Sequence, residues 1–316
     1  MRSPTHLDCF FVSYLALSHT NTVKLTIAEN FRGLFYVPYY ALRELSLAQE
    51  HGLDIEWLPP GSPGGAIHDV KSGKIDLPWG GPMRVMIDHD TSADDEHRLL
   101  SLSEAVGRDP FCLLSNQENL SLTDLPNLRL SVVKEVPTPW LCLQADLADR
   151  GLSIPRQLVT NWSMQEQLDA LARNEVDVIQ AFEPFVSQAL LGGAHLLYEA
   201  SERGPTVYTG FITSRATLKA RQRELAALDT ALATTLRWMH DAGPDETARL
   251  VNGYFSELSH AQLANAAKRY LAGSVWSHNT SINRAGFERL SESFFRGGAI
   301  RAPANYESCV FNFGDH

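Results

Sequence analysis

Residues 23–58 read VKLTIAENFRGLFYVPYYALRELSLAQEHGLDIEWL and contain a strand, a helix and a second strand in succession. Val23–Ala28 is rich in β-branched and aliphatic residues, which favours a strand. Apolar side chains recur at near-helical spacing in residues 38–50, and Gly52 is typical of the position just after a helix. Residues 53–58 alternate polar and apolar side chains, as a strand does. This order predicts two parallel strands joined by a right-handed crossover.

The same alternation continues to residue 88. The turn cluster PPGSPGG precedes a predicted helix at residues 66–72, and a third strand is predicted at residues 74–79. The turn Gly80-Gly81-Pro82 then leads into a helix at residues 83–88. Strands that alternate with helices over short connections predict an α/β fold with a parallel sheet.

A second unit with this alternation begins near Pro110. Its predicted strands lie at residues 128–133, 158–161 and 176–182, and its predicted helices at residues 138–150, 163–174 and 184–191. A strand at residues 207–213 is followed by a helical tail. The tail's predicted helices lie at residues 218–240, 246–258, 261–270 and 283–295. Since the second unit is already self-contained, we predict that the tail returns to the first unit.

The length of 316 residues suits two domains. We predict two α/β lobes with a ligand cleft between them. The first lobe is discontinuous, residues 23–108 plus 214–316, and the second is residues 109–213. Residues 1–22 form an extension whose apolar part, CFFVSYLALS, has the length of a secretory signal but little basic sequence before it. A degraded signal, a start site placed too early and a disordered extension all stay open.

Composition excludes several classes of function. The 27 basic and 37 acidic residues give a net charge of −10, which argues against a nucleic-acid partner and against anionic lipid. No run of about 18 apolar residues occurs, so we expect no insertion into a membrane.

Enzyme and metal motifs are missing from the sequence. GxSxG, GxxxxGK[ST], GxGxxG and HExxH do not occur. Of the four cysteines, Cys112 and Cys142 sit in apolar runs that predict buried free thiols. The acidic stretch around His89 is more typical of a solvated loop than of a metal site. We therefore expect no metal and no cofactor.

Open parallel sheets bind ligands beyond the carboxyl ends of their strands. The residues that follow the predicted strands are rich in aromatic and polar side chains, which suits a pocket with aromatic walls. The candidate ligand-binding residues are Asn30, Phe31, Tyr36, Trp79, Gly80, Gly81, Arg84, Glu104, Thr138, Trp140, Glu183 and Tyr208.

Several candidates have an alternative role in the fold. Gly80 and Gly81 suit a tight turn as well as close approach of backbone to a ligand. Thr138 suits the cap of the helix that follows it, and Trp140 suits the core. Glu183 suits the cap of a helix that starts at the next residue.

The order and spacing of these segments resemble substrate-binding proteins of ABC transporters, of the nitrate, alkanesulfonate and thiamine-pyrimidine-precursor type. The likeness rests on LTIAENFRGLFYVPYYALRELSLAQEHGLDIEWLP, KSGKIDLPWGGP and LARNEVDVIQAFEPF, and it covers roughly residues 23 to 240. It implies the type II periplasmic binding protein fold, hinge closure on a small molecule, and delivery to the membrane subunits of an ABC importer. It also implies a periplasmic location, with a cytoplasmic one as the alternative.

One branch of this family contains thiamine-pyrimidine synthases, which use pyridoxal phosphate with a Lys and a His of the protein. This chain has Gly80 and Arg84 at the matching positions, which argues against synthase chemistry. The Asn30-Phe31 pair and Glu183 match residues near the ligand in that branch. The resemblance therefore implies a small, flat, partly polar ring. An enzyme of thiamine-pyrimidine or small-acid metabolism and a cytoplasmic sensor stay as alternatives.

The ligand's charge depends on which residues face the cleft. Arg84 favours a carboxylate, phosphate or sulfonate if it faces the cleft. Four acids outnumber it in this region: Glu29, Glu104, Glu135 and Glu183. We therefore expect a neutral or weakly basic aromatic ligand stacked on Trp79 or Trp140, and keep a small organic anion such as a sulfonate as the alternative.

Overall fold

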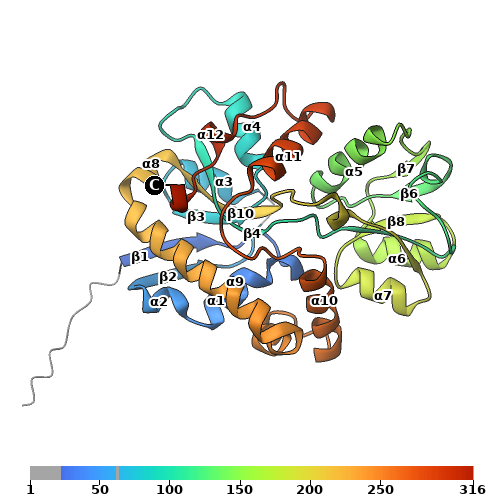
Figure 1. Ribbon diagram of the computed structural model, residues 1–316, viewed down its shortest axis with the longest axis horizontal. Coiled ribbons are helices and arrows are strands. Elements are labelled where there is room, and N and C mark those ends of the chain that lie inside the picture. Colours follow the sequence, from blue (N-terminus) through green and yellow to red (C-terminus); the bar gives the residue numbers. More distant parts are fainter. Residues whose placement is uncertain (1–22, 62–63, 316) are drawn as a thin grey trace, which may run out of the picture.

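The computed structural model describes residues 23–61 and 64–315, so the predicted extension at residues 1–22 lies outside the described residues. Two five-stranded sheets form two lobes side by side (Figure 1). The first sheet has the order β2-β1-β3-β10-β4, with strands β1 (Val23–Ala28), β2 (Leu53–Leu58), β3 (Leu77–Gly80), β4 (Leu99–Val106) and β10 (Thr209–Ser214). The predicted parallel pairing is confirmed for β1 with β2 and β3.

Short helices follow the strands of the first lobe. They are η1 (Leu34–Tyr36), α1 (Val37–Glu44), α2 (Leu47–Glu50), α3 (Ala66–Lys71) and α4 (Met83–Thr91). The single helix predicted at residues 38–50 is in fact two, because Ser46 adopts a left-handed φ of 54° between α1 and α2.

The second sheet has the order β7-β6-β8-β5-β9. Its strands are β5 (Cys112–Ser115), β6 (Arg129–Ser131), β7 (Gln157–Val159), β8 (Val178–Ala181) and β9 (His195–Glu199). Its helices are η2 (Leu125–Asn127), α5 (Thr138–Asp149), α6 (Met164–Ala172), α7 (Phe185–Leu191) and η3 (Ala200–Arg203). A capping box formed by Ser163 and Glu166 starts α6.

Both sheets are mixed, whereas we predicted parallel ones. β10 runs antiparallel to β3 and β4, and β5 runs antiparallel to β8 and β9. The sequence analysis missed β4, β5 and β9. These strands flank the two segments that join the lobes, residues 107–111 and 200–208, which we call the hinge. One carries the chain out of the first lobe and the other brings it back, so the strands on either side are antiparallel.

The hinge also moves the lobe boundary. β10 pairs within the first sheet, although we assigned residues 209–213 to the second lobe. We therefore propose that the second lobe ends near residue 208 and the first resumes at β10.

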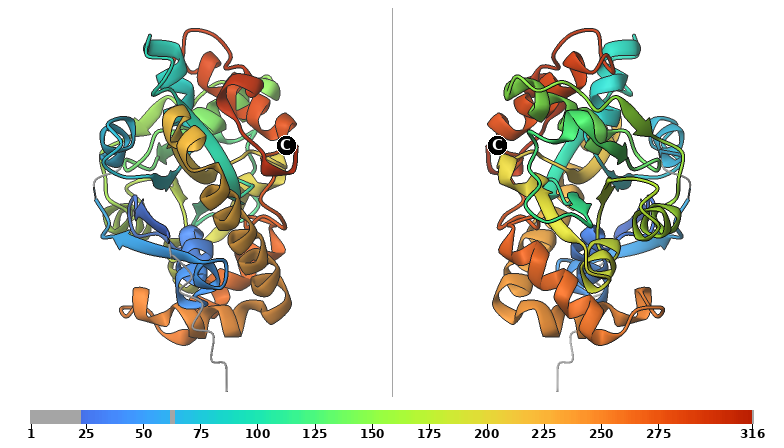
Figure 2. Two further views of the ribbon diagram at one scale, coloured as in Figure 1. Left: turned by 90° about the vertical axis from the view of Figure 1, so that its left-hand side faces the viewer. Right: turned by 90° about the vertical axis from the view of Figure 1, so that its right-hand side faces the viewer.

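The tail packs on the first lobe and reaches the second. It contains α8 (Arg215–Ala220), α9 (Gln222–Val251), η4 (Asn252–Tyr254), α10 (His260–Ala272), α11 (Arg284–Arg296), α12 (Tyr306–Cys309) and η5 (Phe313–Asp315). The long α9 lies along α1 and is non-helical at Gly243, next to Pro244, where we predicted a break (Figures 1 and 2). α10 contacts α7, and α11 contacts α5. No helix of the described chain has the length and hydropathy needed to cross a membrane.

Candidate ligand-binding site

A small cavity lies between the lobes, at the carboxyl ends of β1 and β3. Its volume of about 30 Å³ leaves room for roughly two water molecules. The residues around it are Asn30, Phe31, Phe35, Tyr36, Gly81, Met83, Arg84, Val136, Thr138, Tyr208 and Thr209. They come from the first lobe, the second lobe and the hinge, so a solute in this cavity would touch all three.

Seven of the twelve candidate residues line this inter-lobe cavity. They are Asn30, Phe31, Tyr36, Gly81, Arg84, Thr138 and Tyr208. The sequence analysis missed Phe35, Met83, Val136 and Thr209, each of which lies within two residues of a candidate. Their nearness in sequence to the candidates at the strand ends is the signal that could have found them.

Three further candidates lie outside the cavity lining. Trp79 is 2% exposed and stacks on Tyr39, with ring centroids 4.8 Å apart. Gly80 lies in β3, where an added Cβ would be 3.4 Å from the Ile212 side chain. Trp140 packs against the apolar core of the second lobe. Neither tryptophan is placed to stack on a solute in the cavity, contrary to our expectation.

Two candidate acids are also occupied elsewhere. The Glu183 carboxylate accepts hydrogen bonds from the Ser187 backbone and hydroxyl, both at 3.1 Å, and so satisfies a free N–H in the first turn of α7, although Pro184 holds the cap position. The Arg269 guanidinium also forms an ion pair with the Glu183 carboxylate, with Nε 2.8 Å from Oε1. Glu104 is buried and accepts from the Ser277 hydroxyl at 2.8 Å. Burial raises the pKa of Glu104 to about 7, against hydrogen bonds that lower it.

The charge balance of the cavity is the reverse of the one we predicted. Of the four acids counted in the sequence, none lines the cavity. Glu29 is held by Arg32 and by the Tyr40 hydroxyl, both at 2.7 Å. Glu135 is half-buried outside the lining. The cation Arg84 does line it, so the cavity favours an anion.

Arg84 has no acidic partner in the described part of the chain. Its guanidinium lies against Gly64, where an added Cβ would be 3.1 Å from Cζ. Burial lowers the pKa of Arg84, and the nearby Tyr36 opposes that effect. A half-buried guanidinium without a carboxylate partner destabilises the folded protein. Its charge has lost part of its hydration, and no counter-charge replaces the lost interaction.

Helix ends and amides add to this positive character. The helices α1, α4 and α5 all begin beside cavity-lining residues, and a helix N-terminus carries partial positive charge. The Asn30 side chain accepts from the Gly64 backbone at 3.2 Å and donates to the Tyr36 hydroxyl at 3.3 Å. These bonds hold the polar end of the cavity in place around Arg84.

Thr138 does not cap α5 as we predicted. The cap position is Pro137, without a side-chain hydrogen bond. The Thr138 hydroxyl instead donates to the sulfur of Met83 at 3.8 Å. This contact crosses from the second lobe to the first, and it closes one end of the cavity.

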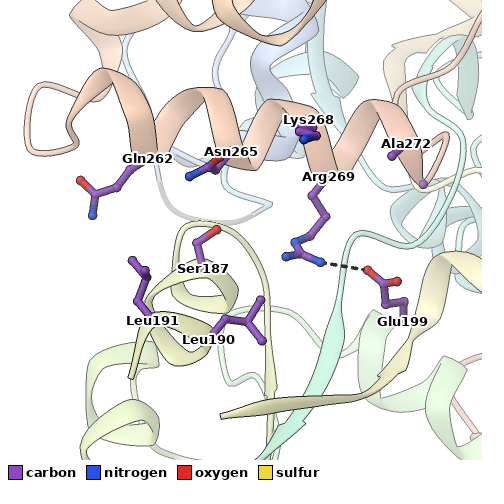
Figure 3. A pocket seen from close by; sticks show the side chains of 10 residues that line it. Ser187, Leu190, Leu191, Glu199, Gln262, Asn265, Lys268, Arg269 and Ala272 are labelled. Carbon is purple, nitrogen blue, oxygen red and sulfur yellow. Dashed lines mark hydrogen bonds and ion pairs between the residues drawn. The ribbon is translucent and has the colours of Figure 1, made fainter. Parts of the chain in front are cut away.

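A larger hollow of about 600 Å³ lies at the edge of the lobe boundary, between α7 and α10 (Figure 3). It is an open groove with two cations: Arg269 is already paired with Glu183 and Glu199, and Lys268 is exposed to solvent. The groove is lined by α7, α10 and the last residue of β9, and no residue from the strand ends of the first lobe lines it. The inter-lobe cavity, whose unpaired cation is half-buried and whose lining comes from both lobes, is therefore the better ligand site.

No family model matches this sequence, and no curated protein matches it. Solved structures, in contrast, do match this chain. The alkanesulfonate-binding protein SsuA from Xanthomonas axonopodis pv. citri, bound to MOPS, is 17% identical with a TM-score of 0.69, over 92% of this chain and 98% of that one. The periplasmic aliphatic sulphonate-binding protein SsuA from Escherichia coli is 15% identical with a TM-score of 0.70, over 89% and 94%. The desulfurization enzyme DSZB is 15% identical with a TM-score of 0.65, over 92% and 96%.

These likenesses, together with the two lobes and the two hinge segments, define a periplasmic binding protein fold. The predicted fold class is thereby confirmed. At such low identity the comparisons carry the fold alone, and both binding proteins and an enzyme share it.

Proposed function

We propose that this protein is a solute-binding protein that closes its lobes on a small organic anion and delivers it to the membrane subunits of an ABC importer. The observation that carries the proposal is the half-buried Arg84, which lines the inter-lobe cavity without an acidic partner in the described residues. A sulfonate or carboxylate would supply the missing charge through parallel hydrogen bonds to the guanidinium. The names of two structural neighbours, both sulfonate-binding, support this choice.

An aromatic group suits the rest of the cavity. Phe31 and Phe35 pack edge to face with centroids 5.9 Å apart, and Val136 closes the wall from the second lobe. Flat apolar rings stack well on such walls. The aromatic ligand expected from the sequence therefore stays part of the proposal, with the charge changed to negative. A pyrimidine-like neutral ring remains the competing ligand.

Ligand entry would need the lobes to separate. The cavity of about 30 Å³ is too small for an organic solute. We propose that the described arrangement is close to the closed form and that bending at the hinge opens it. A periplasmic location follows from this role, and a reporter fused after residue 22 with and without the preceding segment would test export.

The proposal is tested by a thermal-shift and calorimetry screen. The panel is ethanesulfonate, MOPS, benzenesulfonate, benzoate, a thiamine-precursor pyrimidine and benzylamine. We expect the anions to raise the melting temperature, since a ligand that binds the folded state stabilises it by mass action. Stabilisation by the pyrimidine or benzylamine, with no effect of any anion, would contradict the anion proposal.

An enzyme is the second candidate, because DSZB has the same fold. Among the described residues, the cavity lining contains no cysteine, serine, lysine or histidine. Nucleophiles of those types are therefore not in place for covalent catalysis there. Hydrolysis of benzenesulfinate to benzene and sulfite by the purified protein would favour this candidate over transport, because DSZB binds biphenyl-2-sulfinic acid.

A further inference from the structure

Tyr208 is an unusual residue of the inter-lobe cavity. It lines the cavity and is 5% exposed, yet its hydroxyl has no hydrogen-bond partner within the described residues. A buried hydroxyl that loses its bonds to water is unfavourable unless something replaces them. Tyr198 shows the ordinary case, since its buried hydroxyl donates to Asp146 at 2.9 Å.

The backbone just before Tyr208 is strained. Val207 has a φ of 54°, in the left-handed region that β-branched residues avoid. Backbone hydrogen bonds to the first hinge segment and to the end of β4 hold it there. The Val207 N–H donates to the Gly107 carbonyl at 3.2 Å, and the Tyr208 N–H donates to the Val106 carbonyl at 2.7 Å.

The strand that starts after Tyr208 is irregular too. The register between β10 and β4 shifts between Thr209 and Phe211, as in a β-bulge. Tyr208 therefore stands between a strained residue and a bulge, in the segment that must bend when the lobes move. Strain of this kind is concentrated at functional sites.

The Tyr208 ring is in contact with aromatic residues on two sides. It lies 6.4 Å from the Phe35 ring of the first lobe and 5.7 Å from the Phe111 ring of the other hinge segment, centroid to centroid. Its position is thus set jointly by a lobe and by the hinge, and a change in the lobe angle would move it relative to the cavity.

We infer that Tyr208 is a ligand-binding residue carried by the hinge, whose hydroxyl donates to an oxygen of the bound anion when the lobes are closed. The inference rests on the proposed function. Arg84 would hold the anion from the first lobe, Thr138 from the second and Tyr208 from the hinge. A ligand that contacts Arg84, Thr138 and Tyr208 together stabilises the closed arrangement over any other. The backbone at Val207 bends to bring the Tyr208 hydroxyl into place.

The test compares Tyr208→Phe with the matched control Tyr198→Phe. Affinities for benzenesulfonate and MOPS are measured by calorimetry, and melting temperatures are measured without ligand. For Tyr208→Phe we expect about tenfold weaker binding or more, with an unchanged or higher melting temperature, because the hydroxyl has no partner to lose in the free protein. Tyr198→Phe should do the opposite: a lower melting temperature and unchanged affinity.

Two results would overturn the inference. One is wild-type affinity in Tyr208→Phe while Arg84→Gln has lost binding, and the other is a fall in melting temperature as large as that of Tyr198→Phe. The proposed function fails separately, since in that case the wild-type protein itself binds neither anion.

Discussion

The Arg269 side chain donates from Nε to Oε1 of Glu183 at 2.8 Å and so joins helix α10 of the tail to the second lobe. It also pairs with Glu199 at 3.2 Å, as Figure 3 shows. The next residue, Tyr270, accepts a hydrogen bond at its hydroxyl from the Glu183 N–H at 3.1 Å. Because Glu183 is completely buried, its charge depends on these partners. Helix α10 is therefore a brace that holds the lobes at this angle.

Arg269→Met should release the brace. The change leaves the Glu183 carboxylate buried without its cation, which is expected to cost about 2 to 4 kcal/mol in the free energy of unfolding. The lobes should also open further, so small-angle scattering without ligand should give a larger radius of gyration. Lys268→Met is the control, because it removes the same charge from an exposed position on the same helix. Equal effects of the two changes would argue against the brace.

Arg84→Gln should separate ligand binding from stability. Loss of the guanidinium removes two charge-assisted hydrogen bonds to the anion, so affinity for benzenesulfonate should fall about a hundredfold or more. The free protein should keep or gain stability, because an unpaired half-buried charge is removed. Arg43→Gln is the control of equal charge, on an exposed residue that packs over Trp57 and does not line the cavity. Calorimetry measures the affinity of each variant, and a thermal melt measures its stability. A similar loss of affinity in Arg43→Gln would contradict the prediction.

Glu104 should make stability depend on pH. Its pKa is raised from the ordinary 4.5 to about 7 by burial, so the folded state holds a proton that the unfolded state has lost in this window. Stability should therefore fall as the pH rises from about 4.5 to 7, by about 3 kcal/mol relative to Glu104→Gln. Urea unfolding of both proteins at pH 5, 6, 7 and 8 measures this difference. If the free energy of unfolding depended on pH in the same way in the wild-type protein and in Glu104→Gln, burial would not control the pKa of Glu104.

The sequence predicted the parts of the fold that depend on local pattern. The strands at Val23–Ala28 and Leu53–Leu58 and the capping box of α6 follow from alternation and spacing within a few residues. The antiparallel strands that make both sheets mixed could not be predicted from local pattern. β4 is buried along its whole length, so it shows no alternation, and its antiparallel partner β10 lies more than a hundred residues away.

The site was predicted in part for the same reason. The strand-end rule located Asn30, Arg84 and Thr138 at the cavity, because it depends only on where each strand stops. The rule could not say which side chains are already paired. Glu183 is paired with Arg269, 86 positions later in the chain, and it is thereby lost from the acids that were expected to outnumber Arg84.

The start of β10, directly after the hinge, depends on a close approach between two backbones at Gly210. This glycine lies in β10 at the register shift, and a Cβ added to it would lie 2.6 Å from the Leu102 carbonyl oxygen of β4. Real Cβ atoms do not come so near to backbone oxygen, so a side chain here must push the two strands apart.

Gly210→Ala should therefore destabilise the protein by about 1 to 3 kcal/mol, the usual cost of overpacking a tight contact. Weaker anion binding should accompany the loss, since Tyr208 and Thr209 immediately precede the glycine and line the cavity. Gly253→Ala is the matched control, because nothing lies within 4 Å of its added Cβ, and it should change stability by no more than about 0.5 kcal/mol. Urea unfolding and benzenesulfonate calorimetry on both variants test this. Gly210→Ala with wild-type stability would mean that β4 and β10 separate freely, and the start of β10 would then not be fixed by this contact.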